Sequence, residues 1–137
     1  MSTTADSVPE GFIEHQSPSN FMQLMGPLYK REQADGSATV ALRVQERHLN
    51  LHGVGHGGFV ATLIDNAFGY NVAKALGGSV VTANLSIDYM ASAQLGDWVE
   101  ANVQINRKGR RMCFAECRLT VGDRLLARAS SILVPVG

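Results

Sequence analysis

A glycine-rich segment that ends in one carboxylate is the part of this 137-residue chain whose residue types suggest chemistry. It reads Asn50-Leu-His-Gly-Val-Gly-His56-Gly57-Gly58-Phe-Val-Ala-Thr-Leu-Ile-Asp65. Glycines at the start of a helix leave backbone N–H groups open to an oxygen atom of a ligand. A carboxylate surrounded by apolar helix residues is expected to be buried, which makes it a stronger base once it ionises. The segment therefore predicts a site that combines a polarising cradle with a reactive carboxylate.

Asp65 could also be an ordinary helix residue that faces water or binds a nearby backbone group, as a lone aspartate most often is. Its neighbours offer no polar face, however, and the only cation of the same helical segment, Lys74, lies more than two turns away. Those neighbours are Leu63, Ile64, Ala67 and Phe68. The residues therefore favour a functional role for Asp65.

The element that positions both groups is a helix over residues 58–76. Its apolar residues recur on almost every side, which predicts burial all round, and Gly77-Gly78 ends it. These residues are Phe59, Val60, Leu63, Ile64, Ala67, Phe68, Val72, Ala73 and Leu76. The helix should lie inside the protein.

Strands surround this helix in the sequence. A short helix over 21–25, capped by the Pro18-Ser-Asn20 sequence, precedes a hairpin of residues 28–33 and 38–46 with the turn Ala34-Asp-Gly36. Strand patterns then cover 79–90, 97–107, 111–121 and 124–134. About six strands and one long apolar helix predict an α+β fold, an antiparallel sheet wrapped around the helix. We expect residues 1–11 to be disordered and residues 12–137 to form a single domain.

Composition limits the classes of partner. Lys plus Arg equal Asp plus Glu at 12 each, so no overall field favours nucleic acid or an anionic membrane. No secretory signal and no membrane span is apparent, which predicts a cytoplasmic protein with a small ligand. Cys113 and Cys117, four residues apart on a predicted strand, would lie about 13 Å apart, too far for a disulfide. They are expected to be packed thiols.

Several motifs together resemble a known family. Asn50-x-x-Gly53-x-x-His56-Gly57-Gly58 is followed by Leu63-x-Asp65, Thr82-x-x-x-x-Ile87-x-Tyr89 and Leu95-Gly96-Asp97. From about residue 38 to the end, the chain resembles hotdog-fold acyl-CoA thioesterases of the phenylacetate-pathway (PaaI-like) and human thioesterase-superfamily-member-2 type. The resemblance implies a hotdog fold and hydrolysis of an aryl- or medium-chain acyl-CoA to free acid and CoA, with CoA as part of the substrate and no cofactor.

The resemblance also implies roles for individual residues. Asp65 would be the nucleophile or the general base that activates water, and the Thr82 hydroxyl would hold that water. The N–H of Gly57, with Gly58 beside it, would polarise the thioester carbonyl. Asn50 would orient the thioester and His56 would support the loop, although the residues alone are equally typical of a turn and a helix cap.

Helix geometry adds a constraint. In an unbroken helix, Gly57 and Asp65 would be about 12 Å apart along the axis, too far to act on one carbonyl. A second subunit with its helix running the other way would bring Asp65 to Gly57, so the sequence predicts a homodimer with two composite sites. The family resemblance implies the same arrangement and, further, a homotetramer.

The one basic cluster consists of Arg107, Lys108, Arg110 and Arg111, at a predicted hairpin turn. It is either a solvated turn or a site for CoA phosphates. It lacks the interleaved aromatic residues typical of nucleic-acid binding. We also expect an acyl tunnel lined by residues such as Phe59, Phe68, Tyr70, Met90 and Met112.

Other interpretations of the glycine segment are weaker. Gly53-x-Gly55-x-x-Gly58 matches a dinucleotide fingerprint but lacks the repeating strand–helix units that this motif requires. His48, His52 and His56 are spaced by four, but the glycines argue against a helix that would make them converge on a metal. A non-catalytic acyl-CoA or small-ligand binding protein of the same fold remains the alternative, and a dehydratase would need an acid/base pair at the cradle.

Overall fold

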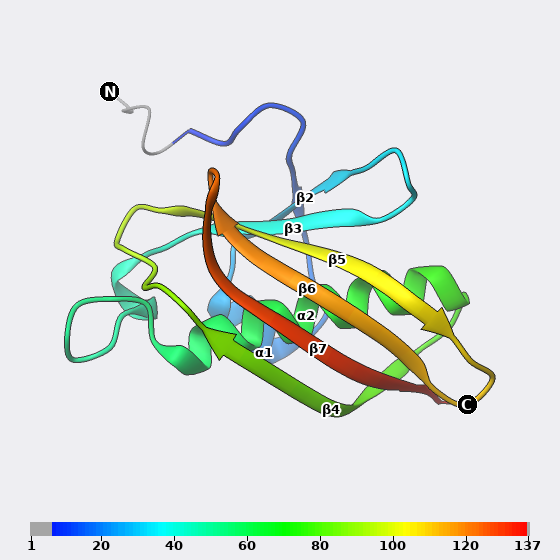
Figure 1. Ribbon diagram of the computed structural model, residues 1–137. Coiled ribbons are helices and arrows are strands. Elements are labelled where there is room, and N and C mark those ends of the chain that lie inside the picture. Colours follow the sequence, from blue (N-terminus) through cyan, green and yellow to red (C-terminus); the bar gives the residue numbers. More distant parts are fainter. Residues whose placement is uncertain (1–6, 137) are drawn as a thin grey trace.

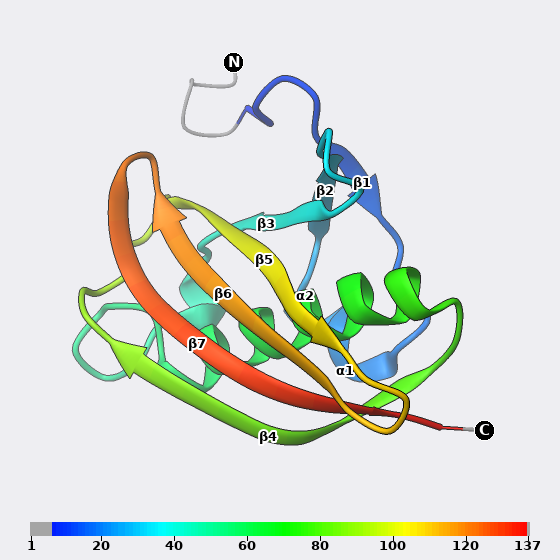
Figure 2. The ribbon, with the colours of Figure 1, turned by 45° about the vertical axis from the view of Figure 1, so that its right-hand side comes forward.

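The computed structural model describes residues 7–136. Seven strands form one antiparallel sheet in the order β1-β2-β3-β5-β6-β7-β4, and a long helix, α2, lies against it (Figure 1). Seen from the side, the sheet curves around this helix (Figure 2). The elements are β1 Ile13–His15, α1 Asn20–Met25, β2 Leu28–Glu32, β3 Ala38–Arg43, α2 Gly57–Leu76, β4 Val80–Tyr89, β5 Trp98–Lys108, β6 Cys113–Val121 and β7 Arg124–Pro135. The predicted sheet wrapped around one long helix is confirmed, with seven strands instead of about six.

Helix α2 buries one side against the sheet. Seven of the nine residues of the predicted apolar pattern are buried, and Phe68, Ile64 and Leu63 are almost wholly inaccessible to solvent, whereas Ala73 and Leu76 are half-buried. Gly77 ends the helix with φ of 73°, a left-handed conformation that glycine adopts without strain. The expectation of burial on every side is wrong for one face, where Asp65 and Tyr70 are only half-buried. Thr62, Asn66 and Gly69 are also half-buried and lie between Asp65 and Tyr70 around the circumference of the helix. These five residues form the open face of α2.

Strands β5, β6 and β7 form a meander that supplies most of the opposing core. Along β6, the buried residues alternate with exposed ones, as expected for a sheet with one covered face. Cys113 and Cys117 lie on the buried side, and both are free thiols. Burial raises the pKa of Cys117 to about 12, so its thiol stays protonated at neutral pH.

The N-terminal third completes the sheet. Ser19 caps α1 by accepting a hydrogen bond from the Met22 N–H at 3.3 Å, and β2 and β3 form the predicted hairpin, in which Gly36 has φ of 91°. Strand β1, which the sequence did not predict, pairs with β2. Residues 1–6 of the segment expected to be disordered lie outside the described residues. Within residues 7–136, no helix has the length and apolar character needed to cross a bilayer.

Candidate active site

The loop that leads into α2 is fixed by a buried histidine. His48, in a short 3-10 helix, is only 3% exposed. Its Nδ1 accepts the Gln45 N–H at 3.0 Å, its Nε2 donates to the Met25 carbonyl at 2.8 Å, and its ring stacks on Phe59 at 4.3 Å. Its own carbonyl accepts the His56 N–H at 2.8 Å. His48 therefore ties the loop to α1, and burial lowers the pKa of its imidazole.

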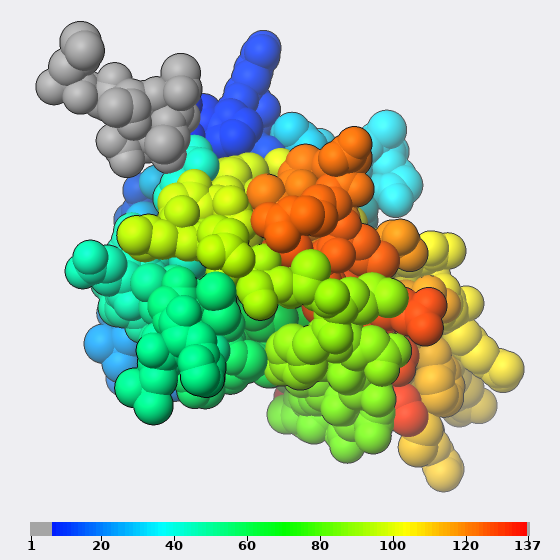
Figure 3. All heavy atoms as spheres, turned by 60° about the vertical axis from the view of Figure 1, so that its left-hand side comes forward, coloured from blue at the N-terminus to red at the C-terminus, as the bar shows by residue number. Residues whose placement is uncertain are grey.

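The same loop is held from the other side by residues 90–97, and Figure 3 shows the two segments side by side. The Gly55 N–H donates to the Ala93 carbonyl at 2.8 Å, and Val54 forms an isolated bridge with Gln94. A side chain at position 55 would be crowded, because a Cβ there would lie 3.0 Å from Ala93 Cβ. The entry to α2 is therefore held on both sides before the helix begins.

His56 caps α2 and decides which glycine N–H is available. Its Nδ1 accepts the Gly58 N–H at 2.8 Å, so the Gly58 donor is already used. Among residues 7–136, no group accepts a hydrogen bond from the N–H of Gly57. The two glycines that the sequence placed together thus differ, and only Gly57 offers its N–H at the positive end of the helix.

Tyr89 covers the start of the helix. Its hydroxyl donates to the Gly57 carbonyl at 2.8 Å, and a Cβ on Gly57 would lie 3.6 Å from this hydroxyl. Sequence reasoning did not name Tyr89 as a site residue, although its place in the Ile87-x-Tyr89 motif was a signal that could have identified it. Asn50 uses its Oδ1 within the loop, accepting the N–H groups of His52 at 2.8 Å and Val54 at 3.3 Å.

Asp65 and Thr82 lie together within one chain. Thr82 Oγ1 donates to Asp65 Oδ1 at 2.7 Å, which links the middle of α2 to strand β4. The expectation that Asp65 is buried is wrong within one chain, because the carboxylate opens into a cleft on the open face of α2. The cleft has a volume of about 310 Å³ and is lined by His15, Ser17, Pro18, Asp65, Asn66, Gly69, Tyr70, Val80, Thr82 and Leu133.

Gly57 and Asp65 lie on one unbroken helix. Eight residues of helical rise separate them by about 12 Å, as predicted. The cleft around Asp65 does not include Gly57. Within one chain, the Gly57 N–H and the Asp65 cleft are therefore separate.

The basic cluster lies at the other end of the helix. Arg107 and Lys108 border a groove of about 550 Å³ together with Asn71, Lys74 and Ala75 of α2. Along the helix axis, this groove extends from about 21 Å from Gly57, at Asn71, to about 27 Å, at Ala75. Arg110 and Arg111 continue the exposed hairpin turn. Within one chain, the basic hairpin therefore lies far from the glycine cradle.

The predicted acyl tunnel does not form from the expected residues. Phe59 and Phe68 belong to the buried core, and Met90 and Met112 are about half exposed on other surfaces. Only Tyr70 borders the cleft. The three histidines spaced by four do not share a helix face, because His48 lies in the 3-10 helix, His52 in the loop and His56 at the helix cap. Within residues 7–136, no three His, Cys, Asp or Glu side chains are grouped so that they could hold a metal ion.

Comparisons with known proteins agree with this architecture. Residues 52–128, more than half of the chain, match the thioesterase superfamily. A putative esterase of Pseudomonas aeruginosa, PA0474, is 39% identical over 92% of this chain and 96% of its own length. Human acyl-coenzyme A thioesterase 13 is 27% identical over 88% of this chain and 86% of its own length.

Solved structures show the same fold. A mutant of the phenylacetic acid degradation protein PaaI from Thermus thermophilus is 30% identical with a TM-score of 0.78, and the match covers 86% of this chain and 100% of that one. A hypothetical thioesterase from Streptococcus pneumoniae, solved with coenzyme A, is 26% identical with a TM-score of 0.75 over 92% and 96% of the two chains. The chain therefore belongs to the thioesterase superfamily, as a hotdog-fold thioester hydrolase.

Proposed function

We propose that the protein hydrolyses an aryl- or medium-chain acyl-CoA to the free acid and CoA. The observation that carries this proposal is the Thr82–Asp65 hydrogen bond of 2.7 Å at the wall of an open cleft, on the same helix that presents the Gly57 N–H. The names of the human and Streptococcus pneumoniae relatives support the substrate class.

Asp65 supplies the reactive carboxylate. Because Thr82 donates to Oδ1, the second carboxylate oxygen, Oδ2, is left to act. It either attacks the thioester carbon directly or takes a proton from a water molecule, which Thr82 Oγ1 can hold through a lone pair. In both routes the carbon–sulfur bond breaks, and the sulfur leaves as the CoA thiolate and takes up a proton. Direct attack forms a mixed anhydride of Asp65 and the acyl group, which water then hydrolyses, whereas in the general-base route water adds to the thioester carbon itself. Transfer of a labelled water oxygen into the Asp65 carboxylate would identify direct attack.

Gly57 stabilises the charge that develops on the carbonyl oxygen. Its N–H lies at the start of a 20-residue helix, where the aligned peptide dipoles add positive potential. A preformed donor of this kind contributes more in the transition state than in the ground state, because the oxygen becomes negative only during attack. The Oδ1 atom of Asn50 holds the loop, which leaves its Nδ2 group to donate a hydrogen bond that orients the thioester. His56 maintains the conformation of the cradle.

The active site is composite in this proposal. Asp65 of one subunit serves the Gly57 cradle of its partner in a homodimer, because the two groups of one chain are too far apart. Two features support the dimer: the open face of α2, and β4, whose second edge has no strand partner among residues 7–136. Val81, Tyr89 and Met90, at this edge, are about half exposed. A homotetramer of two such dimers follows from the family resemblance.

The dimer also gives the basic hairpin a role. If the two helices run in opposite directions, the C-terminal end of one lies near the N-terminal end of the other. Arg107, Lys108, Arg110 and Arg111 of one subunit would then flank the Gly57 cradle of its partner, where the CoA phosphates would emerge.

An acyl-CoA panel with the wild type and Asp65→Asn tests the proposal through release of the CoA thiol. We expect cleavage of at least one aryl or medium-chain acyl-CoA and a fall in kcat of about a thousandfold in the variant, within the range that a general base contributes. Asp123→Asn, at an exposed turn, is the matched control and should retain wild-type kcat. Absence of cleavage together with tight acyl-CoA binding by both proteins would identify a binding protein instead.

A further inference from the structure

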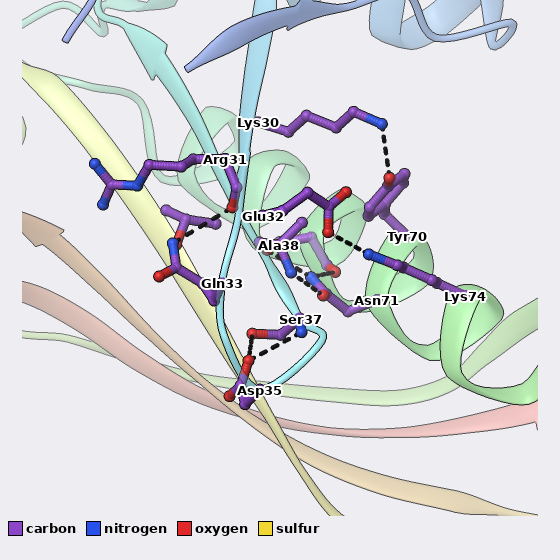
Figure 4. A network of polar contacts seen from close by, with 12 residues as sticks. Lys30, Arg31, Glu32, Gln33, Asp35, Ser37, Ala38, Tyr70, Asn71 and Lys74 are labelled. Carbon is purple, nitrogen blue, oxygen red and sulfur yellow. Dashed lines mark hydrogen bonds and ion pairs between the residues drawn. The ribbon is translucent and has the colours of Figure 1, made fainter. Parts of the chain in front are cut away.

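Three side chains form a polar cluster at the far wall of the Asp65 cleft. Lys30 Nζ of β2 donates to the hydroxyl of Tyr70 on α2 at 2.8 Å, as Figure 4 shows, and also lies 5.0 Å from the centre of the tyrosine ring. The His15 ring of β1 packs edge-on against Tyr70, with 5.1 Å between ring centres. Tyr70 is thus fixed by two strands of the N-terminal third.

This cluster and the reactive carboxylate share one cleft. Asp65, Tyr70 and His15 all line it. Five residues of helical rise place Tyr70 about 7.5 Å along the axis from Asp65, the order of length of a medium-chain acyl group. Gly69 lies between them, and a Cβ built on it would meet nothing within 4 Å. Glycine is a poor helix former, and no atom of the same chain would clash with a side chain at position 69.

The cluster carries donors and positive charge without a carboxylate of its own. Among residues 7–136, no carboxylate oxygen lies within 4.0 Å of Lys30 Nζ, and the nearby Glu32 is engaged by Lys74. Because the Tyr70 oxygen accepts from Lys30, the tyrosine O–H remains able to donate a hydrogen bond to a ligand. Burial lowers the pKa of His15, and the charge of Lys30 lowers it further, which is the effect expected of a positive local potential.

We propose that Tyr70, held by Lys30, determines the acyl specificity of the enzyme and selects acyl groups that end in a carboxylate. The inference rests on the proposed acyl-CoA hydrolysis. With the thioester carbonyl at Asp65, the acyl chain lies across Gly69, and its distal carboxylate accepts the Tyr70 O–H in the field of Lys30. Lys30 is a positioning residue in this arrangement, since it acts through the tyrosine hydroxyl.

The cluster could instead be purely structural, a tie between β2 and α2. The two roles differ in what they do to specificity. A structural tie affects all substrates alike when it is weakened, whereas a carboxylate-binding site affects charged and uncharged acyl groups differently. The informative quantity is therefore the ratio of kcat/KM for adipoyl-CoA to that for hexanoyl-CoA, two substrates of the same chain length that differ at the distal end.

We expect this ratio to exceed one in the wild type and to fall about tenfold in Tyr70→Phe, which keeps the ring and loses the donor. Lys30→Met should lower the ratio similarly and Lys30→Arg should restore most of it. Arg118→Met is the control, because Arg118 is an exposed cation of β6 that does not line the cleft, and it should leave the ratio unchanged. Circular dichroism of each variant checks that it is folded, and the Lys30 pair decides the question if Tyr70→Phe does not fold.

Failure of the inference and failure of the proposed function give different results. If the wild type cleaves hexanoyl-CoA at least as well as adipoyl-CoA, or if neither Tyr70→Phe nor Lys30→Met changes the ratio, the carboxylate selectivity is wrong and the thioesterase proposal stands. If the wild type cleaves no acyl-CoA at all, the proposed function itself is wrong.

Discussion

Replacing Gly57 by proline would remove the proposed oxyanion donor with little disturbance of the fold. Proline lacks a backbone N–H, and Gly57 is the first residue of α2, the helical position at which proline is best tolerated. The preceding residue, His56, already has φ of −63° and ψ of 138°, an extended conformation that the residue before a proline favours. The nearest atom to a Cβ at this position would be the Tyr89 hydroxyl at 3.6 Å, an ordinary contact distance.

The expected loss follows from the role of one preorganised donor. Removing such a donor costs about a hundredfold to a thousandfold in kcat, or about 2.7–4 kcal/mol of transition-state stabilisation. No hydrogen bond within residues 7–136 depends on the Gly57 N–H, so stability should change little. The assay is kcat for the best acyl-CoA of the panel, with thermal unfolding measured in parallel.

Gly57→Ala is the matched control, because alanine introduces the same Cβ contact but retains the N–H. It should keep most of the wild-type kcat. If Gly57→Pro is folded and turns over at the wild-type rate, the Gly57 N–H is not the oxyanion donor. A large loss in Gly57→Ala as well would mean that the Tyr89 contact, and not the N–H, causes the defect.

The same variant tests the composite site. Gly57→Pro and Asp65→Asn are each expected to be inactive, but a mixed dimer would contain one site with both wild-type groups. Random exchange of equal amounts should restore about a quarter of the wild-type sites. Activity that does not return, under conditions where subunits demonstrably exchange, would place both groups of each site on one chain.

Three other outcomes follow from single contacts. Thr82→Val should lower kcat about tenfold, since it removes the hydroxyl that donates to Asp65, whereas Thr82→Ser should retain most activity in the same assay. Burial lowers the pKa of His48, so its contribution to stability should be complete above pH 6.5, the ordinary histidine value, and should decline as the pH falls below it. Urea unfolding between pH 8 and pH 5 measures this decline in the free energy of unfolding. The decline should be smaller in His48→Gln. Cys117, whose pKa is raised to about 12, should resist alkylation at neutral pH in the folded protein and react on unfolding, and rapid labelling in the native state would contradict its burial.

Local patterns were sufficient to predict the main elements. The apolar spacing and the glycines that follow it predicted a helix over residues 58–76, and α2 begins one residue earlier and ends at the predicted residue. The Asp35-Gly36 turn identified the first hairpin, and alternation identified β5 to β7. Strand β1 has only three residues and no periodicity of its own, so its pairing with β2 depends on tertiary contacts. The position of β3 beside β5, and of β4 at the sheet edge, is equally long-range.

The candidate site was predictable to the level of residues and less so to the level of atoms. The motif named Gly57, Asp65 and Thr82 as candidate residues, and the structure brings the last two together. It could not show that His56 takes up the Gly58 N–H, because a capping bond depends on the rotamer of the histidine. Nor could it place His15 beside Tyr70, since these residues belong to segments 55 positions apart that meet only when β1 joins the sheet.

The wrong expectation about helix burial supports the dimer. The residues of α2 predict a helix that is covered on all sides, yet the chain itself covers only one, leaving the open face of α2 partly accessible. That face carries small residues such as Thr62 and Gly69, which allow close approach of another helix or a ligand, with Asp65 on its flank. An apolar pattern records which residues are buried in the assembled protein and does not distinguish burial by the same chain from burial by a partner. The face that one chain leaves open is therefore where we expect the second subunit and the acyl group to lie.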